Sequence, residues 1–398
     1  MRFPGFTEDW EQRKLSDILV ERNEQQVETN EYPLMSFVQG HGVIPKGERY
    51  DRSFLVLDQS KKYKRTELGD FIYSSNNLET GSIGINKTGK AVISPVYSIF
   101  YGVSIGDSQF IGIMSLLPRF IAKMIRFRQG VVYGQWRIHE KDFLDISILI
   151  PSEAERTKIT KLILSIEELI TLHQRKLNNL KLKKKALLQK LFPKNGKRYP
   201  ELRFPGFTDA WEQRKLDNIA KIKTGGGTPK TTNLEYWSGD IPWIQSSDLV
   251  EGDVVHVNIK KFIDNNALKN SAAKLISRDS IALVTRVGVG KVAVINQDFT
   301  TSQDFLSLSD FDGNDIKFIA YQLFRLMQEN AKVLQGTSIK GISKTDLIEQ
   351  SIAIPNSIKE QNLIASLLSQ TDSIITLHQR KLDHLQLQKK ALLQQMFV

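Results

Sequence analysis

The sequence predicts an α+β protein in which two mixed α/β domains alternate with two long helices, and the helices pair as an antiparallel coiled coil. Three observations predict this fold class. The chain contains a long internal repeat, the repeated ends have the periodicity of paired helices, and the two middles alternate short apolar segments with turns. Together they predict that the chain contains two copies of one structural unit, related by pseudo-two-fold symmetry.

The two copies of the repeat have near-identical ends. Residues 2–15 read RFPGFTEDWEQRKL and residues 203–216 read RFPGFTDAWEQRKL, an offset of 201 residues. Residues 170–192 read ITLHQRKLNNLKLKKKALLQKLF and residues 375–397 read ITLHQRKLDHLQLQKKALLQQMF, an offset of 205 residues. The segments between these ends barely resemble each other. Drift alone would have eroded the ends as well, so the pattern favours one scaffold with two different domains. A plain duplication whose middles drifted is the alternative.

The second repeated segment has the pattern of a coiled-coil seam. From Ile166 onward, inward positions recur at alternating steps of four and three residues. Pro151 and Pro355 precede the helices, and Pro193 closes the first one. About 40 residues at 1.5 Å each predict a helix of roughly 60 Å. The two helices most simply pair with each other, and pairing with helices of another protein stays open. The predicted seam residues are Ile166, Ile170, His173, Leu177, Leu180, Leu187, Leu191, Ile375, His378, Leu382, Leu385, Leu392 and Met396.

Polar residues interrupt this seam at equivalent places in both copies. They are His173 and Lys184 in the first helix, and His378 and Lys389 in the second. A polar seam residue fixes the register at some cost in stability, so we expect a structural role. A functional histidine is the alternative.

Each middle alternates short apolar segments with Gly-rich turns, which is typical of mixed α/β domains. Each also has one segment with helical spacing of apolar residues, at residues 110–127 and 314–334. The predicted strands of the first middle are residues 54–57, 70–74, 91–93, 96–103 and 146–150, and those of the second are residues 241–244, 280–284, 292–295, 305–308 and 351–354.

The composition indicates a basic globular chain without cysteine chemistry. The 398 residues include 55 Lys+Arg and 44 Asp+Glu, which gives a formal net charge of +11. This excess predicts a polyanionic partner. The lack of Cys excludes disulfides, thiolate metal sites and a Cys nucleophile. No apolar run is long enough for a membrane helix and the charged N-terminal segment does not resemble a signal peptide, so we expect a cytoplasmic protein.

Two segments come close to catalytic motifs and then depart from them. Residues 84–91 (GINKTGKA) nearly match a phosphate-binding loop, but Ala91 stands where the magnesium ligand Ser or Thr is required, and predicted strands flank the segment. Residues 94–97 (SPVY) are similar to the loop of amino-methyltransferases but lack its second proline. The six His form no metal-binding pattern. We therefore expect no catalytic residue and no metal site.

Recognition of nucleic acid requires polar side chains for base edges, and Lys, Arg or backbone amides for phosphates. Both middles supply them. The Gly run in residues 224–230 can bring backbone amides close to a phosphate, and a flexible loop is the alternative. The candidate DNA-binding residues are Lys64, Arg65, Asn76, Asn77, Lys87, Lys90, Gln135 and Arg137 in the first middle, and Thr224, Gly226, Gly227, Thr228, Lys230, Gln245, Ser246, Ser247, Arg286, Lys291, Thr301, Ser302 and Gln303 in the second.

The order of these segments resembles that of the DNA-specificity (S) subunits of bacterial type I restriction–modification systems. The second middle is similar to their target recognition domains at residues 226–230 (GGTPK), 239–244 (GDIPWI) and 301–305 (TSQDF). The first middle resembles them at residues 69–73 (GDFIY) and 89–97 (GKAVISPVY). The resemblance covers essentially the whole chain.

The resemblance implies target recognition domains at residues 1–150 and 195–355 and spacer helices at residues 151–194 and 356–398. Each domain would recognise one half of a bipartite DNA site, and the helices would fix the gap between the halves. Two modification subunits would methylate adenine N6 with S-adenosylmethionine, and two restriction subunits would use ATP and magnesium. The chain itself would be a non-catalytic adaptor of the bacterial cytoplasm with no cofactor of its own. A stand-alone DNA-binding regulator that dimerises through its helices is the alternative.

Overall fold

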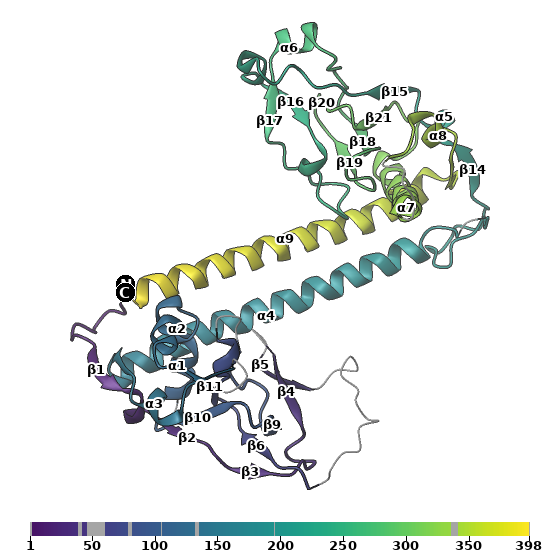
Figure 1. Ribbon diagram of the computed structural model, residues 1–398. Helices are drawn as coiled ribbons and strands as arrows, with labels where there is room; N and C mark the ends of the chain where they lie inside the picture. Colours follow the sequence, from purple (N-terminus) through teal and green to yellow (C-terminus); the bar gives the residue numbers. More distant parts are fainter. Residues whose placement is uncertain are drawn as a thin grey trace. The chain divides into compact units, whose positions relative to one another are not determined.

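The computed structural model describes residues 2–38, 42–45, 60–78, 82–104, 106–131, 135–194, 196–335 and 341–397. It divides into two compact units. Unit 1 comprises residues 1–172 and 382–398, and unit 2 comprises residues 173–381. Each unit therefore contains one strand-rich domain and one part of each long helix (Figure 1). The predicted strand at residues 54–57 lies outside the described residues.

The domain of unit 1 is closed by pairing of its first and last strands. β1 (Glu11–Lys14) runs antiparallel to β13 (Ser147–Ile150). The other sheets have the strand orders β2-β10-β7-β8, β3-β6-β9, β4-β5 and β11-β12. Their bounds are β2 (Leu19–Glu21), β3 (Gln25–Gln26), β4 (Met35–Val38), β5 (Gly42–Pro45), β6 (Tyr63–Thr66), β7 (Phe71–Tyr73), β8 (Ile83–Ile85), β9 (Ala91–Ile93), β10 (Ser98–Gly102), β11 (Gln129–Val131) and β12 (Gln135–Arg137).

Two short helices replace the single helix predicted over residues 110–127. They are α1 (Asp107–Met114) and α2 (Pro118–Ile125), followed later by α3 (Glu140–Leu144). Pro118 breaks the predicted helix because proline lacks the N–H that a helix interior requires. In the first turn of α2 that donor is not needed.

Aromatic side chains fill the core of unit 1. Those of Phe71, Tyr73, Phe100 and Phe143 are fully buried, and their ring centroids lie between 4.8 and 6.5 Å apart. Such separations are typical of favourable tilted and stacked ring pairs. The core thus joins β7, β10 and α3 into one folded domain.

Unit 2 repeats the closing pair of strands. β14 (Glu212–Lys215) pairs with β22 (Ser351–Ile354), and Glu212 faces Ile354 as Glu11 faces Ile150 in unit 1. The other sheets have the orders β15-β21-β18-β19 and β17-β16-β20. The bounds are β15 (Ile222–Gly225), β16 (Ile241–Ile244), β17 (Lys261–Ile263), β18 (Ser280–Val284), β19 (Val292–Ile295), β20 (Thr300–Thr301), β21 (Phe305–Ser309), α5 (Leu216–Ile219), α6 (Asn265–Asn270), α7 (Ile316–Gln335) and α8 (Lys344–Ile348).

The central strand β18 is buried on both faces, which explains its unbroken apolar sequence. Ile281 and Leu283 pack in the cluster that contains Tyr321 of α7. Ala282 and Val284 pack in a second cluster on the other face. Because successive strand residues point to opposite faces, a strand between two cores needs apolar residues at every position.

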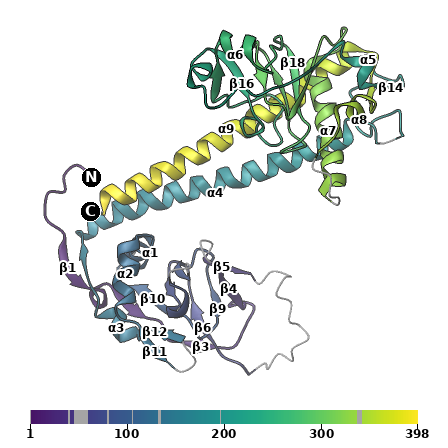
Figure 2. The same cartoon turned by 45° about the horizontal axis from the view of Figure 1, so that its top comes forward.

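The long helices are α4 (Glu153–Lys190) and α9 (Ile358–Met396). Each runs through both units, and within each unit the part from α4 lies beside the part from α9 (Figure 1 and Figure 2). In unit 2, His173 contacts His378 and Lys184 contacts Asp372. Residue numbers therefore rise along one helix as they fall along the other, which confirms the predicted antiparallel pairing. None of the described helices has both the length and the apolar character of a membrane span.

Each predicted seam residue is buried or half-buried, and Leu191 and Met396 belong to apolar clusters that include domain residues. The buried ones are Ile166, Leu177, Leu191, Leu382, Leu385 and Met396, and the half-buried ones are Ile170, His173, Leu180, Leu187, Ile375, His378 and Leu392.

The repeated RFPGF segment forms the same joint in each unit. Arg2 donates to both carboxylate oxygens of Glu155 at 2.9 and 2.6 Å. Arg203 donates to both oxygens of Glu360 at 2.7 and 2.9 Å. Both acceptors lie in the first turn of a long helix, where the helix dipole favours a carboxylate. The near-identical ends of the repeat therefore build one joint twice.

Candidate nucleic-acid interface

The Gly-rich segment of unit 2 is packed against another candidate segment, residues 301–303. The N–H of Gly227 donates to the carbonyl oxygen of Thr301 at 2.9 Å. A Cβ on Gly226 would lie 2.0 Å from the Ser302 carbonyl oxygen, and one on Gly227 would lie 2.1 Å from the Ala272 carbonyl oxygen. Neither position has room for a side chain, so backbone is packed against backbone along this run.

This packing separates buried candidates from exposed ones. Thr301 and Ser302 are buried, whereas Lys230 and Gln303 are exposed. The hydroxyl of half-buried Thr228 donates to the side chain of Gln303. Half-buried Thr224 lies in β15, which ends where the Gly run begins. The exposed side chains at this edge are therefore the ones within reach of a ligand.

Lys291 holds a second candidate segment, residues 245–247, in place. Its ammonium group donates to the carbonyl oxygens of Ser246 and Leu249 at 2.9 and 3.0 Å. Gln245 and Ser246 are half-buried and Ser247 is exposed. Lys291 thus supports the turn through backbone contacts, and Ser247 presents its side chain to solvent.

Lys344, which no sequence pattern singles out, lies against the start of the Gly run. Its Nζ is 2.3 Å from the position that a Cβ on Gly225 would occupy. Burial lowers the pKa of Lys344, and the charges of Arg286 and Lys274 lower it further. These three residues, the Lys344 cluster, form no ion pair within the described parts of the chain. Lys344 is far from the Gly run in sequence, so no local pattern indicates this neighbour.

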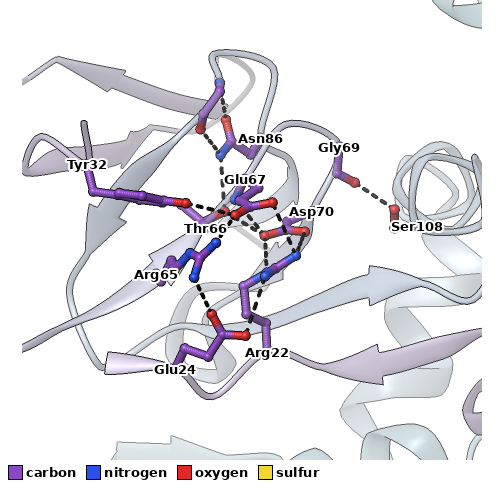
Figure 3. A network of polar contacts seen from close by, with 11 residues as sticks. Arg22, Glu24, Tyr32, Arg65, Thr66, Glu67, Gly69, Asp70, Asn86 and Ser108 are labelled. Carbon is purple, nitrogen blue, oxygen red and sulfur yellow. Dashed lines mark hydrogen bonds and ion pairs between the residues drawn. The ribbon is translucent and has the colours of Figure 1, made fainter. Parts of the chain in front are cut away.

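In unit 1, by contrast, the candidate Arg65 is surrounded by carboxylates (Figure 3). Its guanidinium pairs with Glu24 at 2.9 Å and with Glu67, and it lies 4.7 Å from the ring centroid of Tyr32. Glu67 also accepts a hydrogen bond from the Tyr32 hydroxyl at 2.9 Å. The two carboxylates neutralise the charge of Arg65 within the domain, so this side chain is not free to bind a phosphate.

The same network contains a buried ion pair that anchors it. Arg22 pairs with Asp70 at 2.8 Å, and Asp70 is 2% exposed (Figure 3). Burial raises the pKa of Asp70, and hydrogen bonds from the Glu67 N–H and from Arg22 oppose this only in part. Because desolvation offsets much of the attraction in a buried ion pair, we expect this pair to fix the geometry of the network more than to add stability.

Other cations of unit 1 also have carboxylate partners. Lys64 is 7% exposed, with its Nζ 3.7 Å from Glu140. Lys87 pairs with Glu167 of α4, and Lys90 pairs with Glu31. These three side chains therefore need to exchange a protein carboxylate for a phosphate before they can bind DNA.

The remaining described candidates of unit 1 lie near β12. The side chain of Asn76 accepts a hydrogen bond from the N–H of Trp136 at 2.6 Å. Trp136 is 49% exposed, and the side chain of Arg137 is 54% exposed with its guanidinium 3.7 Å from Glu140. An aromatic and a cationic side chain at one exposed edge suit contact with a nucleic acid. The side chains of Asn77 and Gln135 lie outside what the structure describes.

Neither near-match to a catalytic motif has the surroundings that catalysis requires. Residues 84–91 connect β8 to β9, so no helix follows the segment as a phosphate-binding loop requires. Residues 94–97 connect β9 to β10. Over the described ranges, no group of three or more His, Asp or Glu side chains is placed to hold a metal ion.

Comparison with known proteins gives consistent matches. Residues 208–387 match the family model of the type I restriction modification DNA specificity domain. The type I restriction enzyme MjaIX specificity subunit of Methanocaldococcus jannaschii is 32% identical over 169 residues, 42% of this chain and 38% of the relative. The EcoR124I/EcoR124II specificity subunit of Escherichia coli is 30% identical over 170 residues, 41% of each. Each match thus spans less than half of the relative's length.

A solved structure shows the same fold over the whole chain. The crystal structure of a type I restriction–modification S subunit from M. genitalium aligns over 100% of this chain and 97% of its own, with a TM-score of 0.68 and 12% identity.

Proposed function

We propose that the chain is a DNA specificity subunit of a type I restriction–modification complex with no catalytic role of its own. The family match over residues 208–387 and the partial matches to two specificity subunits support this proposal. It binds a bipartite DNA target, with the domain of unit 1 on one half-site and the domain of unit 2 on the other. In this proposal, the parts predicted from the sequence have separate roles. Residues 1–150 and 195–355 each recognise one half-site, and residues 151–194 and 356–398 form the spacer helices.

One observation carries the proposal: the two units share their joints and differ in their polar surfaces. Arg2–Glu155 and Arg203–Glu360 form the same joint, and the strands that close each domain pair in the same register. Unit 1 presents Trp136 and Arg137 on β12, whereas unit 2 presents the Lys344 cluster beside its Gly run. A common scaffold with two unlike surfaces suits a target with two unlike halves.

The long helices offer apolar surface for partner subunits. At equivalent positions of the two copies, large apolar side chains are each at least 43% exposed: Leu169, Leu172 and Leu182 in α4, and Ile374, Leu377 and Leu387 in α9. Such residues mark association surfaces when they recur together. We assign them to two modification subunits, one for each copy of the repeat. S-adenosylmethionine belongs to those subunits, and ATP and magnesium belong to two restriction subunits.

The proposed setting is the interior of a prokaryotic cell, where chromosomal DNA is the target. The relatives come from an archaeon and a bacterium, so the expectation of a bacterial cytoplasm becomes this broader proposal.

Genome-wide mapping of N6-methyladenine in cells with and without this gene tests the proposal. We expect methylation at one bipartite motif, with two defined halves and a fixed unread gap, and we expect its loss in the deletion strain. A second measurement, DNA binding by the isolated chain, separates the alternative. Tight specific binding without partner subunits, combined with an unchanged methylome, supports the stand-alone regulator instead.

A further inference from the structure

Each unit joins α4 to α9 through one ion pair made from the same two repeat positions. Lys184 and Lys389 are equivalent and 205 residues apart, and so are Glu167 and Asp372. In unit 2, Lys184 pairs with Asp372. In unit 1, Lys389 pairs with Glu167 at 2.7 Å. Each pair takes its lysine from one copy of the repeat and its acid from the other.

Each ion pair also contacts the domain of its own unit. In unit 2, Lys184 donates to the carbonyl oxygen of Gly252, and its Nζ lies 5.5 Å from the ring centroid of Tyr321. The Tyr321 hydroxyl donates to Asp372 at 2.7 Å. In unit 1, Lys87 of the β8–β9 connection pairs with Glu167. The helix pair and the domain are thus tied at one point in each unit.

The ion pair of unit 2 is buried, which favours a geometric role, whereas the side chains of Glu167 and Lys389 in unit 1 are 17% and 23% exposed. Lys184 and Asp372 are 5% and 1% exposed. A buried ion pair pays for desolvation, and well-packed apolar residues in its place are often equally or more stabilising. Ion pairs are directional, however, so these contacts restrict both the register of the helices and the angle at which the domain packs on them.

We propose that these two ion pairs are positioning latches that hold each DNA-recognition domain at a fixed angle on its own helix pair. The second-unit latch is Lys184, Asp372 and Tyr321, and the first-unit latch is Glu167, Lys389 and Lys87. The latches act on specificity because base recognition requires side chains to be placed to within a fraction of an ångström. This inference rests on the proposed function. It also reassigns Lys87 from DNA contact to domain positioning.

Apolar replacement of each latch, in the complex assembled with its partner subunits, tests the inference. The second-unit variant is Lys184→Met with Asp372→Leu and Tyr321→Phe, which leaves no buried charge or phenol unpaired. The first-unit variant is Glu167→Leu with Lys389→Met. The control is Lys185→Met, which removes an exposed charge one residue from Lys184. Exchange of residues 16–149 for those of another specificity subunit first assigns each half-site to its domain.

Methylation of a DNA library with single-base changes in each half-site gives the first readout. We expect each latch variant to raise methylation of mismatched sites by at least about fivefold, relative to the matched site, only in the half-site of its own domain. The melting temperature should stay near that of Lys185→Met. Unchanged discrimination in both halves overturns the inference. So does an equal loss at matched and mismatched sites with a lower melting temperature, because that indicates a purely structural role.

Hydrogen exchange on the same proteins separates this inference from the proposed function. We expect faster amide exchange around Gly252 in the second-unit variant and around Lys87 in the first-unit variant. If the wild-type complex methylates no bipartite site, the proposed function fails. In that case amide hydrogen exchange alone tests the latch proposal. Unchanged exchange rates around both Gly252 and Lys87 would overturn it.

Discussion

Individual cations differ in whether a carboxylate lies beside them. Arg65, Lys87 and Lys90 pair with acids in unit 1, whereas Lys274, Arg286 and Lys344 form no ion pair within the described residues. A cation with a protein partner must give up that interaction to bind a phosphate. Phosphate binding is therefore favoured at the Lys344 cluster.

Removal of charge at the Lys344 cluster should weaken DNA binding without changing sequence preference. For Lys344→Ala or Arg286→Ala, we expect a similar loss of affinity on matched and mismatched DNA. The slope of log affinity against log salt should fall in magnitude by about one for each variant. Salt-titrated binding of the assembled complex measures both quantities.

Lys291→Met is the matched control for that experiment. Its ammonium group donates to the carbonyl oxygens of Ser246 and Leu249, so its loss should lower stability and leave the salt slope unchanged. If the slope of log affinity against log salt is unchanged in Lys344→Ala, this lysine does not contact a phosphate.

At the level of elements, we expect His173 in the paired helices to make the stability of unit 2 depend on pH. His173 and His378 lie with their Nδ1 atoms 2.9 Å apart. Burial lowers the pKa of His173, and the charges of His378, Lys176 and Lys381 lower it further. The unfolded chain therefore takes up a proton more readily than the folded chain. Stability should fall as the pH drops below the ordinary histidine pKa of about 6.5.

Replacement of both histidines by leucine should remove this pH dependence. We expect His173→Leu with His378→Leu to raise stability at neutral pH by about 1 kcal/mol, because apolar side chains then fill the seam. The decline in melting temperature between about pH 7 and pH 5 should be smaller than in the wild type. His384→Asn, at an exposed position of α9, controls for the loss of a histidine. A double variant with the wild-type pH profile would contradict this account.

The regular elements were largely predictable, and the failures have local causes. β16, β18, β19 and β22 have the predicted bounds, because each is a short apolar run between turns. The predicted helix at residues 110–127 is interrupted at Pro118, because proline has no N–H to donate inside a helix. The spacing of apolar residues, on which the prediction relied, does not reveal this missing donor.

For the whole molecule, the length of the long helices should set the gap between the two half-sites. Insertion of seven residues after Leu172 and seven after Lys381 keeps the contacts of each unit, because these are the boundaries between the units. Each helix gains about 10 Å. We expect an unread gap longer by up to about three base pairs, with both half-sites unchanged.

Methylome mapping of the insertion variant measures the gap and the half-sites together. A same-length replacement of the flanking residues controls for local disturbance. An altered half-site with an unchanged gap would refute a spacing role for the helices.

The repeat, the helix periodicity and the net charge of +11 predict two domains on paired antiparallel helices and a polyanionic partner. These features can be predicted from the linear sequence because the spacing of apolar residues along the chain decides which face of a helix or strand is apolar. Partners of charged groups are decided differently. Lys344 meets the Gly run, and Lys184 meets Asp372, only after distant segments have packed together. The fold therefore determines which cations are free to bind a ligand and which hold the domains in place.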